Sequence, residues 1–207
     1  MTSPWLSWIQ QLQGIAQTGL HYQNHPFDVK RYEQVQEIAS AMLLAQAEDD
    51  PKPIAGLFQQ DIGHATPKVE VRGVVFRDDK ILLVQESSDG KWALPGGWAD
   101  IGDSPSQAVE REIFEEAGYT TKATQLLAVY DRANPRHGHP AAPYHSYKLF
   151  FLCEITGGQP TPSYETTAID FFGPSEIPPL SPGRTSPGHL ERFFAYRQNP
   201  ALPPDFD

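Results

Sequence analysis

The chain has 207 residues and a formal net charge of −10 at neutral pH. Surfaces that bind nucleic acid are usually basic, so this charge argues against a nucleic-acid partner. The single cysteine, Cys153, excludes an internal disulfide. Because the sequence has neither a run of about 18 apolar residues nor a basic signal start, we expect a cytoplasmic protein without membrane association.

Two helical patterns occupy the first 65 residues, over Trp5–Gly19 and Asp28–Ala47. Each has an apolar stripe at helical spacing, formed by Trp5, Trp8, Ile9, Leu12, Ile15 and Ala16 in the first and by Tyr32, Val35, Ile38, Ala39, Met42 and Leu43 in the second. Asp28 is predicted to be the N-cap of the second helix. Since two helices alone bury too little surface to be stable, we expect them to pack on the following domain, on a second copy of the chain, or on both.

The stretch Glu48–Lys68 contains several prolines and glycines and is typical of a linker. We therefore predict a small helical domain with its linker over residues 1–65 and a larger domain over residues 66–207. The tryptophan-rich helices also raise the alternative of a purely structural or interaction module.

Strand and helix patterns alternate in the larger domain, which predicts an α/β fold. Strands are expected at Val69–Phe76, Ile81–Gln85, Lys91–Leu94, Gln125–Asp131, Tyr147–Ile155 and Ala168–Phe172, with a closing helix at His189–Arg197. Asp78-Asp79 and Gly157-Gly158 are predicted turns, and the first of them would close a hairpin. Cys153 lies in an apolar run and is predicted to be a buried core thiol rather than a nucleophile.

A helix with an unusual acidic face is predicted between the third and fourth of these strands. Ser104 and Gln107 have the spacing of a capping box, and Gly118 is placed to end the helix. Gly96 and Gly97 precede the helix in a short loop, where they allow the backbone to approach a ligand closely.

Three acids of this helix, Glu112, Glu115 and Glu116, follow an i, i+3, i+4 pattern and share one face. Like charges at this spacing repel one another, so the cluster calls for a cation. Mg2+ takes oxygen ligands, often one or two carboxylates together with substrate phosphates. Arg111 can reach Glu115 at i+4. The stretch is therefore a candidate metal and phosphate site.

The spacing Gly97, Asp103 and then Arg111-Glu112-Ile113-Phe114-Glu115-Glu116-Ala117-Gly118-Tyr119 closely resembles the Nudix box. It departs from the family pattern at Asp103, where the family usually has Glu, and this leaves a direct metal role for Asp103 open. The resemblance covers about residues 67–200. It implies a Nudix α/β/α sandwich with a mixed sheet, preceded here by the small α-helical domain.

The same resemblance implies a hydrolase of nucleoside diphosphates linked to another moiety, in which water attacks phosphorus with the help of Mg2+ or, in its place, Mn2+. The implied metal ligands are Glu112, Glu116 and Glu115 with the carbonyl of Gly97, and Arg111 would orient the acids. A catalytically silent nucleotide-binding regulator with the same fold is the alternative, although the box acids are all present.

The general base is left open between a box glutamate and Glu165, which stands in a loop just before the last strand. Three cations are candidates for substrate phosphate contacts, although such residues are more often surface or salt-bridging residues: Arg72, Arg132 and Lys148. The loop 134–145, with three histidines and three prolines, is predicted to be a flexible substrate loop.

The preceding helical pair and tail segments such as Gly183-Arg184-Thr185 resemble a Nudix subgroup with a small N-terminal domain. That resemblance implies ADP-ribose or CDP-choline-like substrates. The tryptophan-rich helices are better interpreted as a dimer interface added to an enzyme, so we expect a homodimer.

Overall fold

A computed structural model describes residues 4–46 and 63–207 of the chain. These residues form two compact units, one made of Met1–Pro67 with Ala141–His145 and the other of Lys68–Pro140 with Ser146–Asp207. Most of the predicted linker Glu48–Lys68 lies outside the described residues.

The first unit contains two helices, α1 (Pro4–Tyr22) and α2 (Pro26–Gln46), close to the predicted ranges. Gly19 lies so close to α2 that a Cβ atom there would be 2.4 Å from the ring of Tyr32, which explains a glycine inside α1. The predicted N-cap is wrong, because α2 begins at Pro26 and Asp28 lies inside its first turn. There Asp28 accepts a hydrogen bond from Arg31 at 2.7 Å.

The apolar stripes of α1 and α2 are only partly buried. Ile9, Ala39 and Leu43 form a small core between the helices. By contrast, Trp5 and Trp8 remain about half exposed, at 48% and 49%. The two helices therefore keep a substantial apolar surface that they do not cover themselves.

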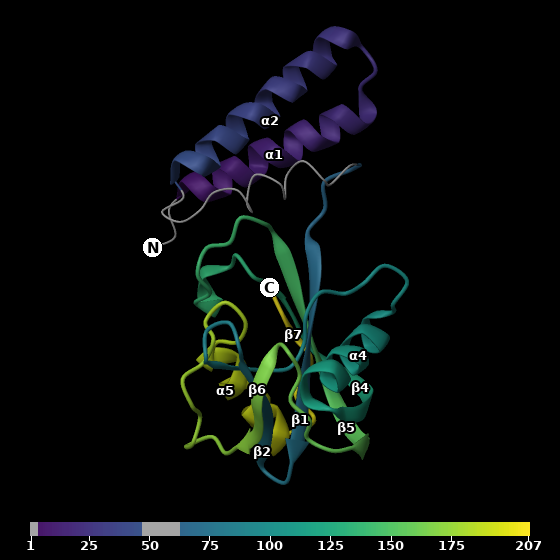
Figure 1. Cartoon of the computed structure of the whole chain (residues 1–207), viewed down its shortest axis with the longest axis vertical. Helices are drawn as coiled ribbons and strands as arrows, with labels where there is room; N and C mark the ends of the chain where they lie inside the picture. Colours follow the sequence, from purple (N-terminus) through teal and green to yellow (C-terminus); the bar gives the residue numbers. More distant parts are fainter. Residues whose placement is uncertain (1–3, 47–62) are drawn as a thin grey trace. The chain divides into compact units, whose positions relative to one another are not determined.

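The second unit is a mixed sheet with helices on both faces, as predicted (Figure 1). The strands run in the order β3-β2-β1-β5-β4-β7, and β6 pairs with β2. β1 is parallel to β5, whereas the pairs β1–β2, β2–β6 and β4–β5 are antiparallel. The strands are β1 (Lys68–Arg77), β2 (Lys80–Glu86), β3 (Trp92–Ala93), β4 (Tyr119–Asp131), β5 (Ser146–Gly158), β6 (Thr166–Phe172) and β7 (Asp205–Phe206).

One face of the sheet is covered by α4 (Pro105–Ala117) and the other by α5 (Pro187–Gln198), each over its own hydrophobic core. The core under α4 contains Val71 and Ile113, and the core under α5 contains Phe150 and Phe193. Cys153 is buried in the first of these cores, as predicted, and burial raises the pKa of its thiol to about 12.

Two strand ends differ from the prediction. β4 begins at Tyr119 rather than near Gln125, because irregular steps in its register let it continue alongside β5. The predicted turn at Gly157-Gly158 is wrong: both residues still belong to β5, and Gly158 has a φ of 78°. A Cβ atom at Gly158 would lie 2.3 Å from the carbonyl oxygen of Gly118, so the glycine permits close strand contact.

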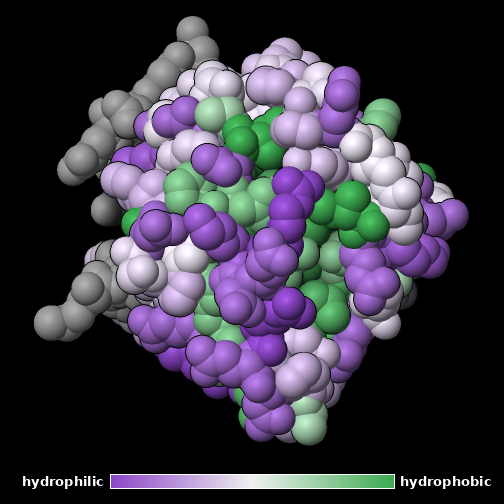
Figure 2. Space-filling view, turned by 90° about the horizontal axis from the view of Figure 1, so that it is seen from below, coloured by the Kyte–Doolittle hydropathy of each residue, from purple (hydrophilic) through white to green (hydrophobic). Residues whose placement is uncertain are grey.

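Hydrophilic residues cover most of the face seen in Figure 2, and hydrophobic residues appear there in separate patches. Among residues 4–46 and 63–207, no helix has the length and apolar character needed to cross a membrane.

Candidate functional site

The ends of α4 have the predicted caps. Ser104 Oγ accepts a hydrogen bond from the Gln107 amide at 3.3 Å, and the Gln107 side chain accepts one from the Ser104 amide at 2.9 Å. Gly118 ends the helix with a φ of 73°, and its amide donates to the carbonyl of Phe114 at 2.9 Å. These caps fix where the acidic face of the helix begins and ends.

The packing of α4 against the sheet determines how far its acidic side chains lie from the strands. Gly73 of β1 lies under the helix, where a Cβ atom would be 2.5 Å from Ile113 Cδ1. The helix therefore sits close to the sheet, and the side chains of Glu112 and Glu116 are buried at its edge, with 9% and 5% of each residue exposed.

Arg111 is surrounded by carboxylates. Its guanidinium lies 2.9 Å from Glu112, 3.2 Å from Glu115, 3.1 Å from Asp103 and 3.2 Å from Asp100. The predicted contact with Glu115 is present, and Asp103 contacts Arg111. These carboxylates raise the pKa of Arg111 above its usual value against the effect of burial, so Arg111 holds several acids in fixed positions.

The loop before α4 places backbone groups against the same acids. The amide of Gly96 donates to Glu116 Oε2 at 2.8 Å, and a Cβ atom at Gly97 would lie only 2.8 Å from Glu112 Oε2. Gly96 has a φ of 143°, and a side chain there would collide with β1. The carbonyl of Gly97 accepts a hydrogen bond from the Val71 amide at 2.8 Å, which attaches the loop to β1.

Burial makes the charged form of these acids costly. Desolvation raises the pKa of Glu116 to about 8, despite the nearby charge of Arg72, and it also raises the pKa of Glu112. Within the described part of the chain, no group of three His, Cys, Asp or Glu side chains forms a complete ligand set for a metal ion. Mg2+ usually needs only one or two carboxylates besides phosphate and water oxygens. The buried pair Glu112 and Glu116 fits that requirement.

The predicted general-base residue is placed by the pairing of β2 with β6. The carbonyl of Glu165 accepts a hydrogen bond from the Ser87 amide at 2.8 Å. The next residue, Thr166, is opposite Glu86 in the sheet, and its hydroxyl donates to the carbonyl of Glu116 at 2.7 Å. The Glu165 loop is therefore attached both to the end of β2 and to the acidic helix.

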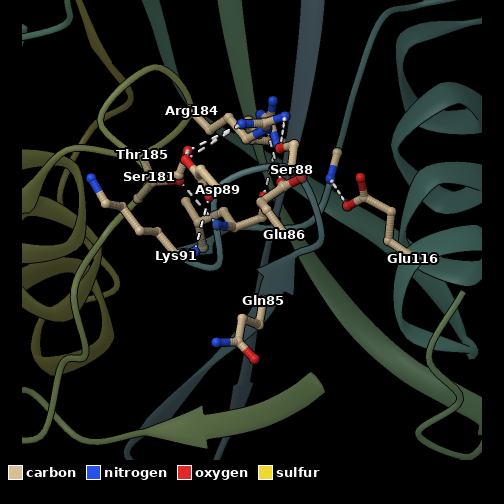
Figure 3. A network of polar contacts seen from close by, with 12 residues as sticks. Gln85, Glu86, Ser88, Asp89, Lys91, Glu116, Ser181, Arg184 and Thr185 are labelled. Atoms are coloured by element: carbon tan, nitrogen blue, oxygen red, sulfur yellow. Dashed lines mark hydrogen bonds and ion pairs between the residues drawn. The ribbon is translucent and has the colours of Figure 1, made fainter. Parts of the chain in front are cut away.

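Sequence reasoning missed Glu86, a buried acid at the end of β2 (Figure 3). Arg184 Nε lies 2.9 Å from Glu86 Oε1, as an ion pair rather than an aligned hydrogen bond. Desolvation raises the pKa of Glu86 in spite of this partner. A signal was available, since Glu86 ends an apolar strand and Arg184 belongs to the Gly183-Arg184-Thr185 segment.

Two of the predicted substrate cations contact one buried carboxylate. Lys148 Nζ donates to Glu70 Oε1 at 2.7 Å, and Arg72 Nε donates to the same oxygen at 2.8 Å. Although burial opposes it, these two cations lower the pKa of Glu70 to about 2, and burial lowers the pKa of Lys148 to about 7. The structure thus brings Arg72 and Lys148 together in an internal network.

The third cation and the histidine loop are also largely internal. Arg132 is buried and donates to the carbonyl of Pro140 at 2.9 Å. His137 and His139 are buried as well, and their rings lie 5.4 Å and 5.0 Å from the ring of His189 on α5. Ring packing therefore places these two histidines in the interior, whereas the flexible substrate loop stays a prediction.

Residues 66–193 match the family model described as the NUDIX domain. The chain belongs to the Nudix hydrolase family. Residues 3–58 match a second model, described as a UDP-X-like, N-terminal oligomerisation domain. The Nudix box identified in the sequence therefore lies in a Nudix domain preceded by this N-terminal domain.

Nudix relatives resemble the chain along its whole length. The Bacillus subtilis protein named "Putative ADP-ribose pyrophosphatase YjhB" is 42% identical over 203 residues, covering 98% of this chain and 97% of the relative. A crystal structure of a UDP-X diphosphatase is 30% identical, with a TM-score of 0.64, and the match covers 100% of each chain. A crystal structure of an ADP-ribose pyrophosphatase from Streptococcus suis covers 69% of this chain at 38% identity, with a TM-score of 0.60.

Proposed function

We propose that this Nudix hydrolase cleaves the diphosphate bond of a nucleoside diphosphate linked to another moiety, with Mg2+ as the cofactor and Mn2+ as a substitute. ADP-ribose and UDP-linked compounds are the proposed substrate class, because relatives that match most or all of the chain are named for them. The observation that carries the proposal is the buried pair Glu112 and Glu116 against the Gly96–Gly97 loop.

The proposed metal ligands are Glu112 and Glu116, with Glu115 and the Gly97 carbonyl nearby. When bound, Mg2+ would withdraw charge from the phosphate oxygens and make a water molecule a better nucleophile. Glu112 and Glu116 suit this role because their burial disfavours an uncompensated negative charge.

Other residues of the chain would orient the acids and accept the proton. Arg111 fixes the carboxylate positions through its contacts with Glu112 and Glu115. Glu165 would accept a proton from the attacking water as the new oxygen–phosphorus bond forms and the bridging bond breaks. Its support is the attachment of its loop to Ser87 and, through Thr166, to the acidic helix.

A substrate panel with fixed Mg2+ tests this proposal. ADP-ribose, a UDP-sugar and CDP-choline are incubated with the enzyme, and the released monophosphates are separated and measured. We expect hydrolysis that stops with a chelator and returns with Mg2+ or Mn2+. Glu116→Gln should lower kcat at least about a hundredfold, since a charged ligand is lost from the reacting centre.

Glu110→Gln is the matched control on the same helix, because Glu110 contacts the amide of Ala123 and Lys122 instead of the acid pair. This variant should retain wild-type kcat. Nucleotide binding without metal-dependent hydrolysis of any panel member would support the silent regulator instead.

The second part of the proposal is a homodimer formed through α1 and α2. The match of residues 3–58 to an oligomerisation domain supports it, as do the exposed rings of Trp5 and Trp8. Large exposed apolar side chains of this kind are typical of protein interfaces.

A further inference from the structure

The guanidinium of Arg184 is held in one orientation by groups from two segments of the chain (Figure 3). Its Nε lies 2.9 Å from Glu86 Oε1, and its Nη1 donates to Ser181 Oγ at 3.1 Å and lies 3.9 Å from Asp89 Oδ2. Its Nη2 donates to Ser88 Oγ at 3.3 Å, the longest of its hydrogen bonds. The Nη2 edge is therefore the one most easily transferred to another acceptor.

The backbone that carries Arg184 is also fixed. The Ser181 amide donates to the carbonyl of Trp92 at 2.8 Å, and the Thr185 hydroxyl accepts a hydrogen bond from the Leu94 amide at 2.9 Å. The carbonyl of Arg184 itself accepts a hydrogen bond from Lys148 Nζ at 3.1 Å. Because both the main chain and the guanidinium are anchored, ligand binding costs little further conformational entropy at Arg184.

Arg184 differs from the other cations near the acids either in its burial or in the number of carboxylates around it. Arg72 and Lys148 are buried on Glu70, and Arg111 is surrounded by carboxylates. The side chain of Arg184 keeps 35% of its surface exposed. An incoming anion can reach the Nη2 edge of this guanidinium while Nε keeps its ion pair with Glu86.

Strand pairing places Arg184 beside the proposed reacting centre. Its partner Glu86 is opposite Thr166 in the sheet, and Thr166 donates to the carbonyl of Glu116. Figure 3 shows Arg184 and Glu86 on one side of the site and Glu116 facing them from α4.

We propose that Arg184 binds a phosphate of the substrate diphosphate and that Glu86 and Asp89 are positioning residues for its guanidinium. This inference rests on the proposed function, which places the diphosphate at Glu116. A planar guanidinium forms paired hydrogen bonds with phosphate oxygens. Carboxylates that bind its other N–H groups fix the direction in which this pair of donors points.

The test measures binding without turnover. Calorimetric titration with α,β-methylene-ADP in the presence of Mg2+ compares the wild-type enzyme with Arg184→Gln and Arg184→Lys, and adenosine serves as the uncharged ligand. Loss of a charge-assisted hydrogen bond should weaken α,β-methylene-ADP binding about tenfold to a hundredfold in Arg184→Gln. Arg184→Lys should recover part of this loss, because it keeps the charge but not the pair of donors. Adenosine affinity should stay unchanged.

Arg197→Gln is the matched control, since Arg197 lies on α5 and pairs with the exposed Asp79 at 3.7 Å. It should bind both ligands as the wild type does. Unchanged α,β-methylene-ADP affinity in Arg184→Gln overturns the inference, and so does an equal loss of affinity for adenosine, which would indicate structural damage. A wild-type enzyme that does not bind α,β-methylene-ADP also overturns it. Normal binding with no hydrolysis of any substrate refutes the proposed function alone.

A separate measurement tests whether Glu86 acts by positioning Arg184. Glu86→Gln should change α,β-methylene-ADP affinity when Arg184 is present and should have little further effect in the Arg184→Gln background. Equal effects in both backgrounds would mean that Glu86 acts independently of Arg184, which contradicts the positioning role.

Discussion

Lys148 Nζ lies 2.7 Å from Glu70 Oε1, and neither side chain has appreciable contact with solvent. Arg72 binds the same carboxylate, so one acid balances two buried cations. Removal of one partner from a buried ion pair usually costs about 3–5 kcal/mol, because the remaining charge is left uncompensated.

Substitutions of Glu70 and of Lys148 should therefore lower the free energy of unfolding by different amounts. Glu70→Gln leaves both cations without their carboxylate and should lower the free energy of unfolding by about 3–5 kcal/mol. Lys148→Met should cost less, because Arg72 still neutralises Glu70. Urea denaturation measures both. Lys80→Met is the control, since its pair with Glu176 is exposed and should be worth less than about 1 kcal/mol. Equal losses in the two network variants would contradict this account.

The buried histidines predict a loss of stability in acid. Burial lowers the pKa of His139 from 6.5 to about 4 and that of His189 to about 2. The unfolded chain therefore binds more protons than the folded chain below pH 6.5, and stability falls as the pH drops from 6.5 toward 4. Each histidine contributes up to about 1.4 kcal/mol per pH unit.

The free energy of unfolding, measured by urea denaturation at several pH values, tests whether the buried histidines cause the loss of stability in acid. His189→Phe removes one titrating ring among the rings of His137, His139, Tyr130 and Phe150. Its stability should depend less steeply on pH than that of the wild type. The same slope in both proteins would show that His189 is not responsible.

Arg111 should affect turnover more than substrate binding. Its guanidinium touches carboxylates of α4 and the preceding loop, so Arg111→Ala should lower kcat by about tenfold or more with little change in KM. Arg111→Lys should retain more activity, since one ammonium can still contact one or two of the acids. Steady-state kinetics on the best panel substrate provides the measurement. A raised KM with unchanged kcat would indicate direct contact with substrate instead.

The exposed tryptophans should determine the oligomeric state. Trp5 and Trp8 form an edge-to-face pair with ring centroids 5.2 Å apart on α1. The double variant Trp5→Ala with Trp8→Ala should shift the proposed homodimer toward monomer, because large aromatic side chains dominate interface energies. Size-exclusion chromatography with light scattering gives the mass. Glu33→Gln on α2 should leave it unchanged. A double variant that remains dimeric would place the interface elsewhere.

The acidic helix could be predicted from local sequence because its determinants are local. Ser104, Gln107 and Gly118 cap the helix through neighbours a few residues away, and the contact of Arg111 with Glu115 follows from one helical turn. The order of strand and helix patterns predicted an α/β fold, and the mixed sheet was implied by the resemblance to the Nudix family. The metal ligands and the general base stay predictions.

Other features depended on long-range pairing that sequence periodicity does not encode. Glu86, at the end of β2, and Arg184 are far apart in the chain and meet because their segments are joined by contacts such as that of Ser181 with Asp89. Arg72 and Lys148 are on adjacent parallel strands, and nothing in either strand indicated that Glu70 would hold both. The end of β5 was misjudged because glycines suit a strand under close contact as well as a turn.

Arg184 belongs to two networks at once, through its side chain to Glu86 and through its carbonyl to Lys148. Substitutions in the loop that carries Arg184 and in the interior of the sheet are therefore not independent of each other. A change that moves the Arg184 backbone deprives the buried ammonium of an acceptor, whereas a change at Lys148 removes one of the hydrogen bonds that hold the loop. Substitutions at these two positions should appear together in the history of the family.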